Sequence, residues 1–236
     1  MESLERILRG NDEHVASIGE DHFEGVRERQ DPPIVSVSCS DSRVPAEGVW
    51  NAAADGDLFT SVNVGNQVWT DIDGQRVVND AVGYAVSSLS VDLIAVLGHT
   101  GCGAITAAYE AVFGDSADVN PLPDRHAQPA VEAAVGRLIP IVEEAKRAGV
   151  VDASTPPLRA VNRLVEYAVR EQVEFLVDDE SVPEDVVVAG FVYDFQRAYG
   201  DADGAAYLVS LDAETDAELL RDTLAAEYHA RVVSLL

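Results

Sequence analysis

The apolar run VDLIAVLGH, residues 91–99, constrains the fold more than any other stretch of the sequence. It is almost continuously apolar and does not alternate with polar residues, which is typical of a strand that helices cover on both faces. Three more runs read as strands: residues 34–39, 57–66 and 186–195. Segments with helical spacing of apolar residues separate these runs. Strands that alternate with helices predict an α/β layer with a mostly parallel β-sheet.

The 236 residues are interpreted as one domain, because no internal repeat and no Pro/Ser-rich linker divides them. Residues 3–28 carry apolar positions at helical spacing, which predicts one or two helices in an N-terminal arm of residues 1–30. Residues 31–211 form the predicted α/β core, with residues 205–211 as its last strand, and residues 212–236 predict a closing helix. Within the core, further helices are expected over residues 73–90, 103–113, 131–149 and 158–177, and an exposed loop over residues 114–129.

The chain is strongly acidic, with 42 Asp and Glu against 16 Lys and Arg and a net charge of −26. Nucleic acids and anionic membranes need cationic patches, so neither is an expected partner. The acids are scattered and Lys146 is the single lysine, which favours adaptation to a salt-rich cytoplasm over an acidic face for a basic partner.

No apolar run reaches the roughly 18–20 residues of a membrane span, and the N-terminus lacks a signal-peptide core. We therefore expect a soluble cytoplasmic protein.

The chain has two cysteines, Cys39 and Cys102. In a cytosolic chain they indicate a metal site or a catalytic thiol, with an inert buried thiol as the alternative. Cys39 ends one predicted strand, and His99 and Cys102 follow the end of another. Since the carboxyl ends of parallel strands meet in one crevice, we expect these three side chains to converge. Two thiolates and an imidazole suit Zn²⁺, and three protein ligands leave a fourth position open, as catalytic zinc sites do.

CSDSR at residues 39–43 and HTGC at residues 99–102 together resemble the zinc signature of the β-class carbonic anhydrases. The resemblance covers roughly residues 5–210 and continues in NVGNQV (63–68), GYAVSSLSVDLIAVLGHTGCGAI (83–105), EYAVREQVEFL (166–176) and GFVYDF (190–195). It implies one α/β domain with four parallel strands, an antiparallel edge strand and flanking helices. It also implies one Zn²⁺ per chain on Cys39, His99 and Cys102, and reversible hydration of CO₂ to bicarbonate and a proton by attack of zinc-bound hydroxide.

The same resemblance makes Asp41 and Arg43 catalytic. Arg43 can hold the carboxylate away from the metal by a bidentate pair, which leaves Asp41 free to accept the hydrogen of the attacking hydroxide; a surface salt bridge is the plain alternative. Gln30 corresponds to a glutamine that donates to a substrate oxygen, or is an ordinary polar residue. The implied substrate pocket includes Phe59, Val64 and Tyr84, for which core packing is the alternative. It also includes Gly103, whose backbone N–H at a helix N-terminus suits an anion such as bicarbonate.

The sequence departs from the family at several positions. Ser36 and Val62 stand where one branch has the Trp and Arg of a regulatory bicarbonate site, so we expect no such site and a plant-type arrangement. Gly65 replaces an alanine, and Ser88 stands where plant members carry a proton-relay histidine, which leaves the proton route open. The resemblance further implies a homodimer or higher homo-oligomer, with N-terminal helices around the partner and active sites near the interface.

Two other functions are compatible with these motifs. The same scaffold hydrolyses CS₂ or COS in some relatives, because these linear substrates need the same zinc chemistry. A non-catalytic zinc protein that bridges partners through its acidic surface is the second alternative, although a structural site gains nothing from an open fourth position.

Overall fold

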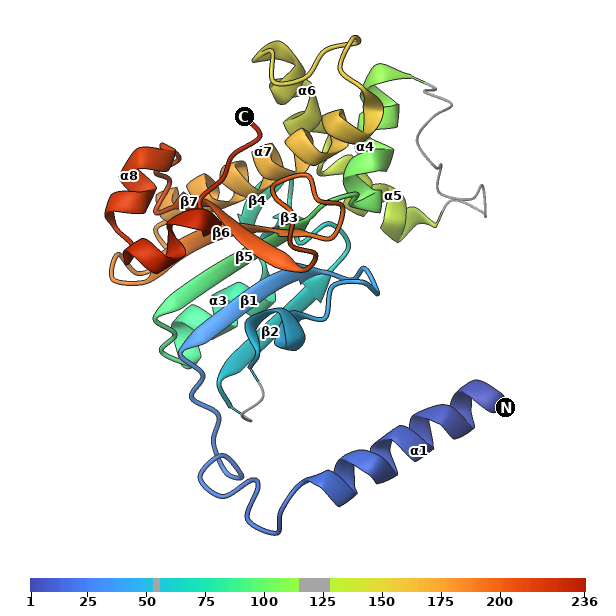
Figure 1. Ribbon diagram of the computed structural model, residues 1–236, viewed down its shortest axis with the longest axis vertical. Coiled ribbons are helices and arrows are strands. Elements are labelled where there is room, and N and C mark those ends of the chain that lie inside the picture. The colour runs from blue at the N-terminus through green and yellow to red at the C-terminus, as the bar shows by residue number, and fades with distance from the viewer. Residues whose placement is uncertain (53–55, 115–127) are drawn as a thin grey trace.

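The computed structural model describes residues 1–52, 56–114 and 128–236 (Figure 1). Its centre is a five-stranded sheet in the order β2-β1-β5-β6-β7. The strands are β1 (Ile34–Cys39), β2 (Leu58–Asn63), β5 (Leu93–His99), β6 (Val187–Asp194) and β7 (Ala205–Leu211). The first four in sheet order are parallel and β7 is antiparallel to β6, which confirms the predicted sheet. Most of the predicted loop at 114–129 lies outside the described residues.

The two faces of the sheet are covered unequally. Val188 and Val192 of β6 point into the main core, which also contains buried residues of α3 (Asp80–Ser88), α4 (Gly103–Phe113), α6 (Ile139–Arg147) and α7 (Pro157–Asp178). The alternate residue Ala189 belongs to a smaller cluster with Leu220 and Val232 from the C-terminal segment. This period of two along β6 places helices on both faces, as the continuous apolar strands predict.

The N-terminal arm is helical over half of its predicted length. Helix α1 (Glu2–Ser17) is followed by turns, so the prediction of helix as far as residue 28 was wrong. Figure 1 shows α1 standing apart from the sheet, and none of its residues is buried. Its apolar residues Leu4, Ile7, Leu8 and Val15 are all more than half exposed. Their exposure leaves an apolar helix face that no other described residue buries.

Two other segments that were each predicted as a single helix, residues 73–90 and 131–149, are not continuous helices in the structure. Residues 73–90 contain strand β4 (Gln75–Val78), which pairs with β3 (Trp69–Ile72), and α3 begins only at Asp80. The segment 131–149 is two helices, α5 (Pro129–Gly136) and α6. Pro140 explains that break, because a proline ring clashes with the carbonyl four residues earlier, here that of Gly136.

The prediction of one closing helix over residues 212–236 is also wrong. This segment consists of α8 (Ala217–Asp222), a 3₁₀ helix (Ala226–Arg231) and an extended end. Val232 forms a bridge to Leu208 of β7, and its carbonyl accepts a hydrogen bond from Arg221, so tertiary contacts hold the chain out of a helix. A short helix, α2 (Ala46–Trp50), follows β1 and was not predicted. Among the described residues no helix is long and apolar enough to cross a membrane.

Candidate metal centre

Cys39, His99 and Cys102 meet at the carboxyl edge of the sheet. Cys39 is the last residue of β1, His99 is the last residue of the neighbouring β5, and Cys102 precedes the first turn of α4. Their ligand atoms lie within 4.8 Å of one another and all three residues are buried. No second grouping of this kind occurs in the part of the chain that the structure describes. We call these three residues the metal cluster.

The state of His99 fits a metal ligand. Its Nδ1 lies 3.0 Å from the carbonyl oxygen of Thr100, so Nδ1 carries the hydrogen and Nε2 presents its lone pair to the cluster. Nε2 is buried and has no hydrogen-bond partner. An unsatisfied buried polar atom is costly, and coordination would satisfy it. A carbonyl that fixes the second ring nitrogen is the usual support of a metal-bound histidine. With two thiol groups beside it, this donor set fits Zn²⁺.

Neighbouring groups shift the pKa values of the two thiols in opposite directions. Among the smaller influences, the backbone of Gly65 favours the thiolate of Cys39, and the backbone of Ala104 and Ile105 in the first turn of α4 favours that of Cys102. The hydrogen bond from the Cys102 thiol, with His99 as a weaker influence, lowers the pKa of Cys39 to about 4. The same hydrogen bond, together with complete burial, raises the pKa of Cys102. One thiolate is thus already favoured, and a bound divalent cation would favour the second.

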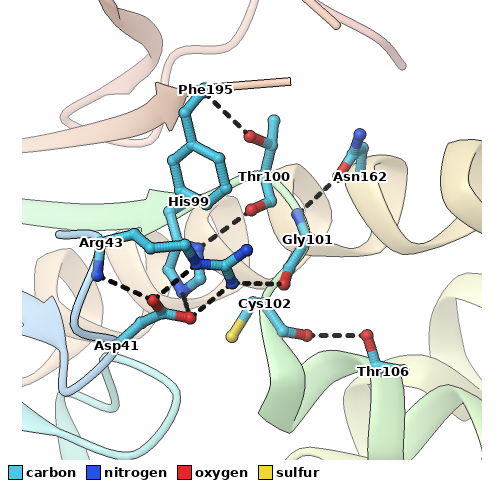
Figure 2. A network of polar contacts seen from close by, with 9 residues as sticks. All are labelled: Asp41, Arg43, His99, Thr100, Gly101, Cys102, Thr106, Asn162 and Phe195. Atoms are coloured by element: carbon cyan, nitrogen blue, oxygen red, sulfur yellow. Dashed lines mark hydrogen bonds and ion pairs between the residues drawn. The ribbon is translucent and has the colours of Figure 1, made fainter. Parts of the chain in front are cut away.

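Asp41 and Arg43 form a bidentate pair beside the cluster (Figure 2). Arg43 donates from Nε to Asp41 Oδ1 at 2.8 Å and from Nη2 to Oδ2 at 2.6 Å, and its backbone N–H also donates to Oδ1. These hydrogen bonds lower the pKa of Asp41 to about 2. Asp41 Oδ2 lies 3.9 Å from His99 Nε2. The carboxylate is therefore adjacent to the metal cluster, with both oxygens engaged by Arg43.

Three further residues support this arrangement and were not singled out from the sequence. The Phe195 ring stacks on His99 at 5.7 Å between centroids, and the Arg43 guanidinium lies 4.5 Å over it. Asn162 accepts the Gly101 N–H at 2.9 Å, while the Gly101 carbonyl accepts from Arg43 (Figure 2). Buried Asp194 accepts from the Thr100 hydroxyl. Asp194 ends β6 and Phe195 follows it, so their place at a strand end also points to the site.

The predicted pocket residues divide into two groups. Val64 follows β2, and Gly103 follows Cys102, so both lie at the metal end. Phe59 pairs with Val35 of β1, four residues before Cys39, which places it roughly 13 Å along the strand from the cluster. Tyr84 packs on Phe59 at 5.9 Å between ring centroids, and Gln30 lines a pocket with Tyr84. One chain therefore does not bring Gln30, Phe59 or Tyr84 to its own metal cluster.

A sheet of this topology with a buried Cys₂His set at its carboxyl edge defines an α/β metalloprotein with a catalytic type of zinc site. A family model described as carbonic anhydrase matches residues 34–199. The chain is 30% identical to "Carbonic anhydrase 2" of Mycobacterium tuberculosis over 207 residues, 88% of each chain. It is 36% identical to a carbonic anhydrase of Emericella nidulans over 108 residues, 44% of this chain and 45% of that one.

Solved structures agree with these sequence comparisons. The β-carbonic anhydrase CafA of Aspergillus fumigatus superposes with a TM-score of 0.68 at 25% identity, covering 93% of this chain and 96% of that one. A tetrameric β-carbonic anhydrase of Sordaria macrospora shares the fold, with a TM-score of 0.64 at 23% identity over 82% and 93% of the chains. This chain belongs to the carbonic anhydrase family, in its β class. The family and the metal cluster together fit a zinc-dependent lyase that hydrates CO₂.

Proposed function

We propose that this chain interconverts CO₂ and bicarbonate with one zinc ion held by Cys39, His99 and Cys102, and that Asp41 and Arg43 act beside the ion. The observation that supports this proposal most directly is the buried cluster of three possible ligands with the Asp41 carboxylate beside it. Both oxygens of that carboxylate accept hydrogen bonds from Arg43. When bound, Zn²⁺ supplies a Lewis acid that lowers the pKa of water.

Arg43 keeps the Asp41 carboxylate out of the fourth ligand position of the metal. A carboxylate 3.9 Å from a ligand nitrogen would itself coordinate the ion, and the bidentate pair opposes this. Asp41 stays ionised because Arg43 lowers its pKa to about 2. An ionised Asp41 accepts the hydrogen of the attacking water and directs the oxygen lone pair at CO₂. The backbone N–H of Gly103, at the start of α4, faces the same end of the sheet and offers a donor to bicarbonate.

The ligand set also determines the pH dependence. Two thiolates cancel the formal charge of Zn²⁺, so water is acidified less than in sites with three neutral histidines. We expect the rate of CO₂ hydration to rise with pH above neutrality.

A second copy of the chain completes the substrate pocket in this proposal. Gln30, Phe59 and Tyr84 lie toward the amino ends of the strands, and Tyr84 is 47% exposed. The apolar face of α1 is also uncovered, which supports a homodimer or higher homo-oligomer in which α1 packs on the partner. Ser36 and Val62 supply no cation for a regulatory bicarbonate site, which supports the plant-type arrangement.

The acidic surface supports a salt-rich cytoplasm as the working environment. Glu171 lies near Glu174 and Glu144, and burial followed by these two charges raises its pKa. Burial and then the Glu171 carboxylate raise the pKa of Tyr167 to about 12. Such like charges repel one another, and salt screens the repulsion.

Stopped-flow CO₂ hydration by the zinc-loaded protein tests the proposal, measured across alkaline pH in low and in high salt. We expect activity that rises with pH and depends on zinc. A fully zinc-loaded, folded protein without activity at alkaline pH in high salt would remove the proposed function.

A further inference from the structure

Gln67 joins the loop after β2 to the rest of the molecule. The residue is 2% exposed, and every polar atom of its side chain has a partner. Oε1 accepts from Arg137 Nε at 2.7 Å. Nε2 donates to the carbonyl of Val64 at 2.8 Å and to that of Ala134 at 3.0 Å. One amide therefore ties the loop to α5 and to the short connection that follows it.

The backbone of Gln67 is held equally firmly. Its N–H donates to Asn63 Oδ1 at 2.7 Å, and its carbonyl accepts from Asn63 Nδ2 at 2.9 Å. The same carbonyl accepts from Asn79 Nδ2 at 2.7 Å, and Asn79 caps α3. The loop of residues 63–67 is closed on itself, and Gln67 fixes it to two helices, α5 and α3. Backbone in such a loop has few other conformations available.

This loop adjoins the metal cluster, because Asn63 pairs with Cys39 across β2 and β1 and its carbonyl accepts the N–H of Ser40 at 2.9 Å. The backbone of Gly65 also helps to lower the pKa of Cys39. Gly65 has φ +81, and a Cβ there would lie 2.9 Å from Leu138 Cδ1 and 3.3 Å from the Ala104 side chain. Gln67 Nε2 is the next neighbour, at 3.6 Å from the same point. The left-handed backbone favours glycine here, and a Cβ would displace the end of the Leu138 side chain.

We propose that Gln67, supported by Arg137, is a positioning residue for the metal centre. It holds Asn63 opposite Cys39, keeps the backbone of Gly65 beside the cluster and keeps Val64 at the pocket, and it contacts neither the metal nor the substrate. A fixed donor orients a ligating thiolate, and losing such outer partners typically lowers metal affinity about 10- to 100-fold. This inference rests on the zinc site of the proposed function and not on CO₂ hydration.

Gln172 provides a matched control. It is also a fully buried glutamine, its Oε1 accepts the N–H of Val68 at 3.0 Å, and its Nε2 donates to the carbonyl of Ala168. It therefore binds the chain one residue beyond Gln67, and none of its hydrogen bonds reaches Gly65 or Val64. Gln67→Met and Gln172→Met each remove one buried amide of the same size from the same part of the molecule.

The test is the rate at which the zinc-loaded protein releases zinc to a chromophoric chelator, with the free energy of unfolding measured for each variant. We expect Gln67→Met to release zinc about 10-fold faster or more than wild type, Arg137→Met to lie between, and Gln172→Met to stay close to wild type. A wild-type release rate in Gln67→Met overturns the proposal. Equal acceleration in Gln67→Met and Gln172→Met also overturns it, because it reports general destabilisation.

Two further measurements cover a variant that folds poorly. Gln67→Glu keeps the acceptor for Arg137 and loses the two donated bonds, so intermediate release is expected, and release as slow as wild type contradicts the role of those bonds. Hydrogen exchange of the Gly65 amide should quicken in Gln67→Met and not in Gln172→Met; unchanged exchange in Gln67→Met contradicts the proposal. All these readouts need zinc but no CO₂, so an inactive wild type leaves them interpretable.

Discussion

The two ends of the parallel strands differ in whether one chain brings the predicted site residues together there. At the carboxyl end, the metal cluster is buried and its supports come from the same chain, including Gly65, Thr100 and Phe195. At the amino end, Gln30 and Tyr84 are exposed. One chain thus brings the proposed metal ligands together, whereas it leaves the proposed pocket residues Gln30 and Tyr84 apart from them.

Loss of a cluster ligand is expected to have the largest effect. Cys102→Ser replaces a soft thiolate with a hydroxyl that stays protonated, so zinc binding and CO₂ hydration should both fall by more than about 100-fold, beyond the loss of an outer partner. Zinc content and stopped-flow rates check this. If Cys102→Ser retains zinc and activity, the carboxyl end of the sheet is not the reaction site.

Arg43→Met tests the role of the Asp41–Arg43 pair at the carboxyl end of the strands. With its partner removed, Asp41 is free to coordinate zinc, and activity should fall about 10- to 100-fold while zinc remains bound. Arg197→Met is the matched control, because Arg197 makes the same bidentate pair with Asp203 on the surface. We expect the control to keep wild-type activity. An Arg43→Met protein as active as that control would reduce the Asp41–Arg43 pair to an ordinary salt bridge.

Subunit mixing tests the amino end. Cys39→Ser lacks the metal and Gln30→Ala lacks a pocket donor, so each homodimer should be impaired. If Gln30 acts on the partner's metal, a mixed dimer contains one intact site, and a statistical mixture with Cys39→Ser should regain about a quarter of wild-type activity. A mixture no more active than the average of its two parents would place both halves of the site in one chain.

The smallest expected effect is on the stability of the metal-free protein. Arg43 lowers the pKa of Asp41 to about 2, so the ionised form favours the folded state. This contribution is fully present above the usual pKa of an aspartate and is lost as pH falls toward 2. Arg43 is half exposed, so we expect at most about 1 kcal/mol. Urea unfolding of wild type and Asp41→Asn should give a difference that is constant near neutrality and shrinks in acid. A difference that grows in acid contradicts the assignment.

The sheet could be predicted because its strands are buried on both faces and so are continuously apolar. The β3–β4 hairpin was missed, although Asp73 and Gly74 have φ of 51 and 79 and Asp-Gly is typical of a two-residue hairpin turn. Asn79 likewise marked the true start of α3 as its N-cap. The broken C-terminal helix could not be predicted, because a distant contact, Leu208 with Val232, decides it.

Within the site, the predictable part was the chemistry that residue type carries. Thiols and an imidazole at strand ends indicate a metal whatever surrounds them. The supporting residues Asn162 and Gln67 have ordinary amide side chains, and their importance lies in hydrogen bonds to residues that only folding brings near. The distance of Gln30, Phe59 and Tyr84 from the cluster likewise follows from strand register, which the motif match does not contain.

The most direct test of the whole account is a zinc titration of the metal-free protein followed by stopped-flow CO₂ hydration at alkaline pH. We predict activity that rises in proportion to bound zinc, stops at one ion per chain, and is absent in Cys102→Ser. A chain that is active without zinc, or inactive when folded and fully loaded, would contradict it.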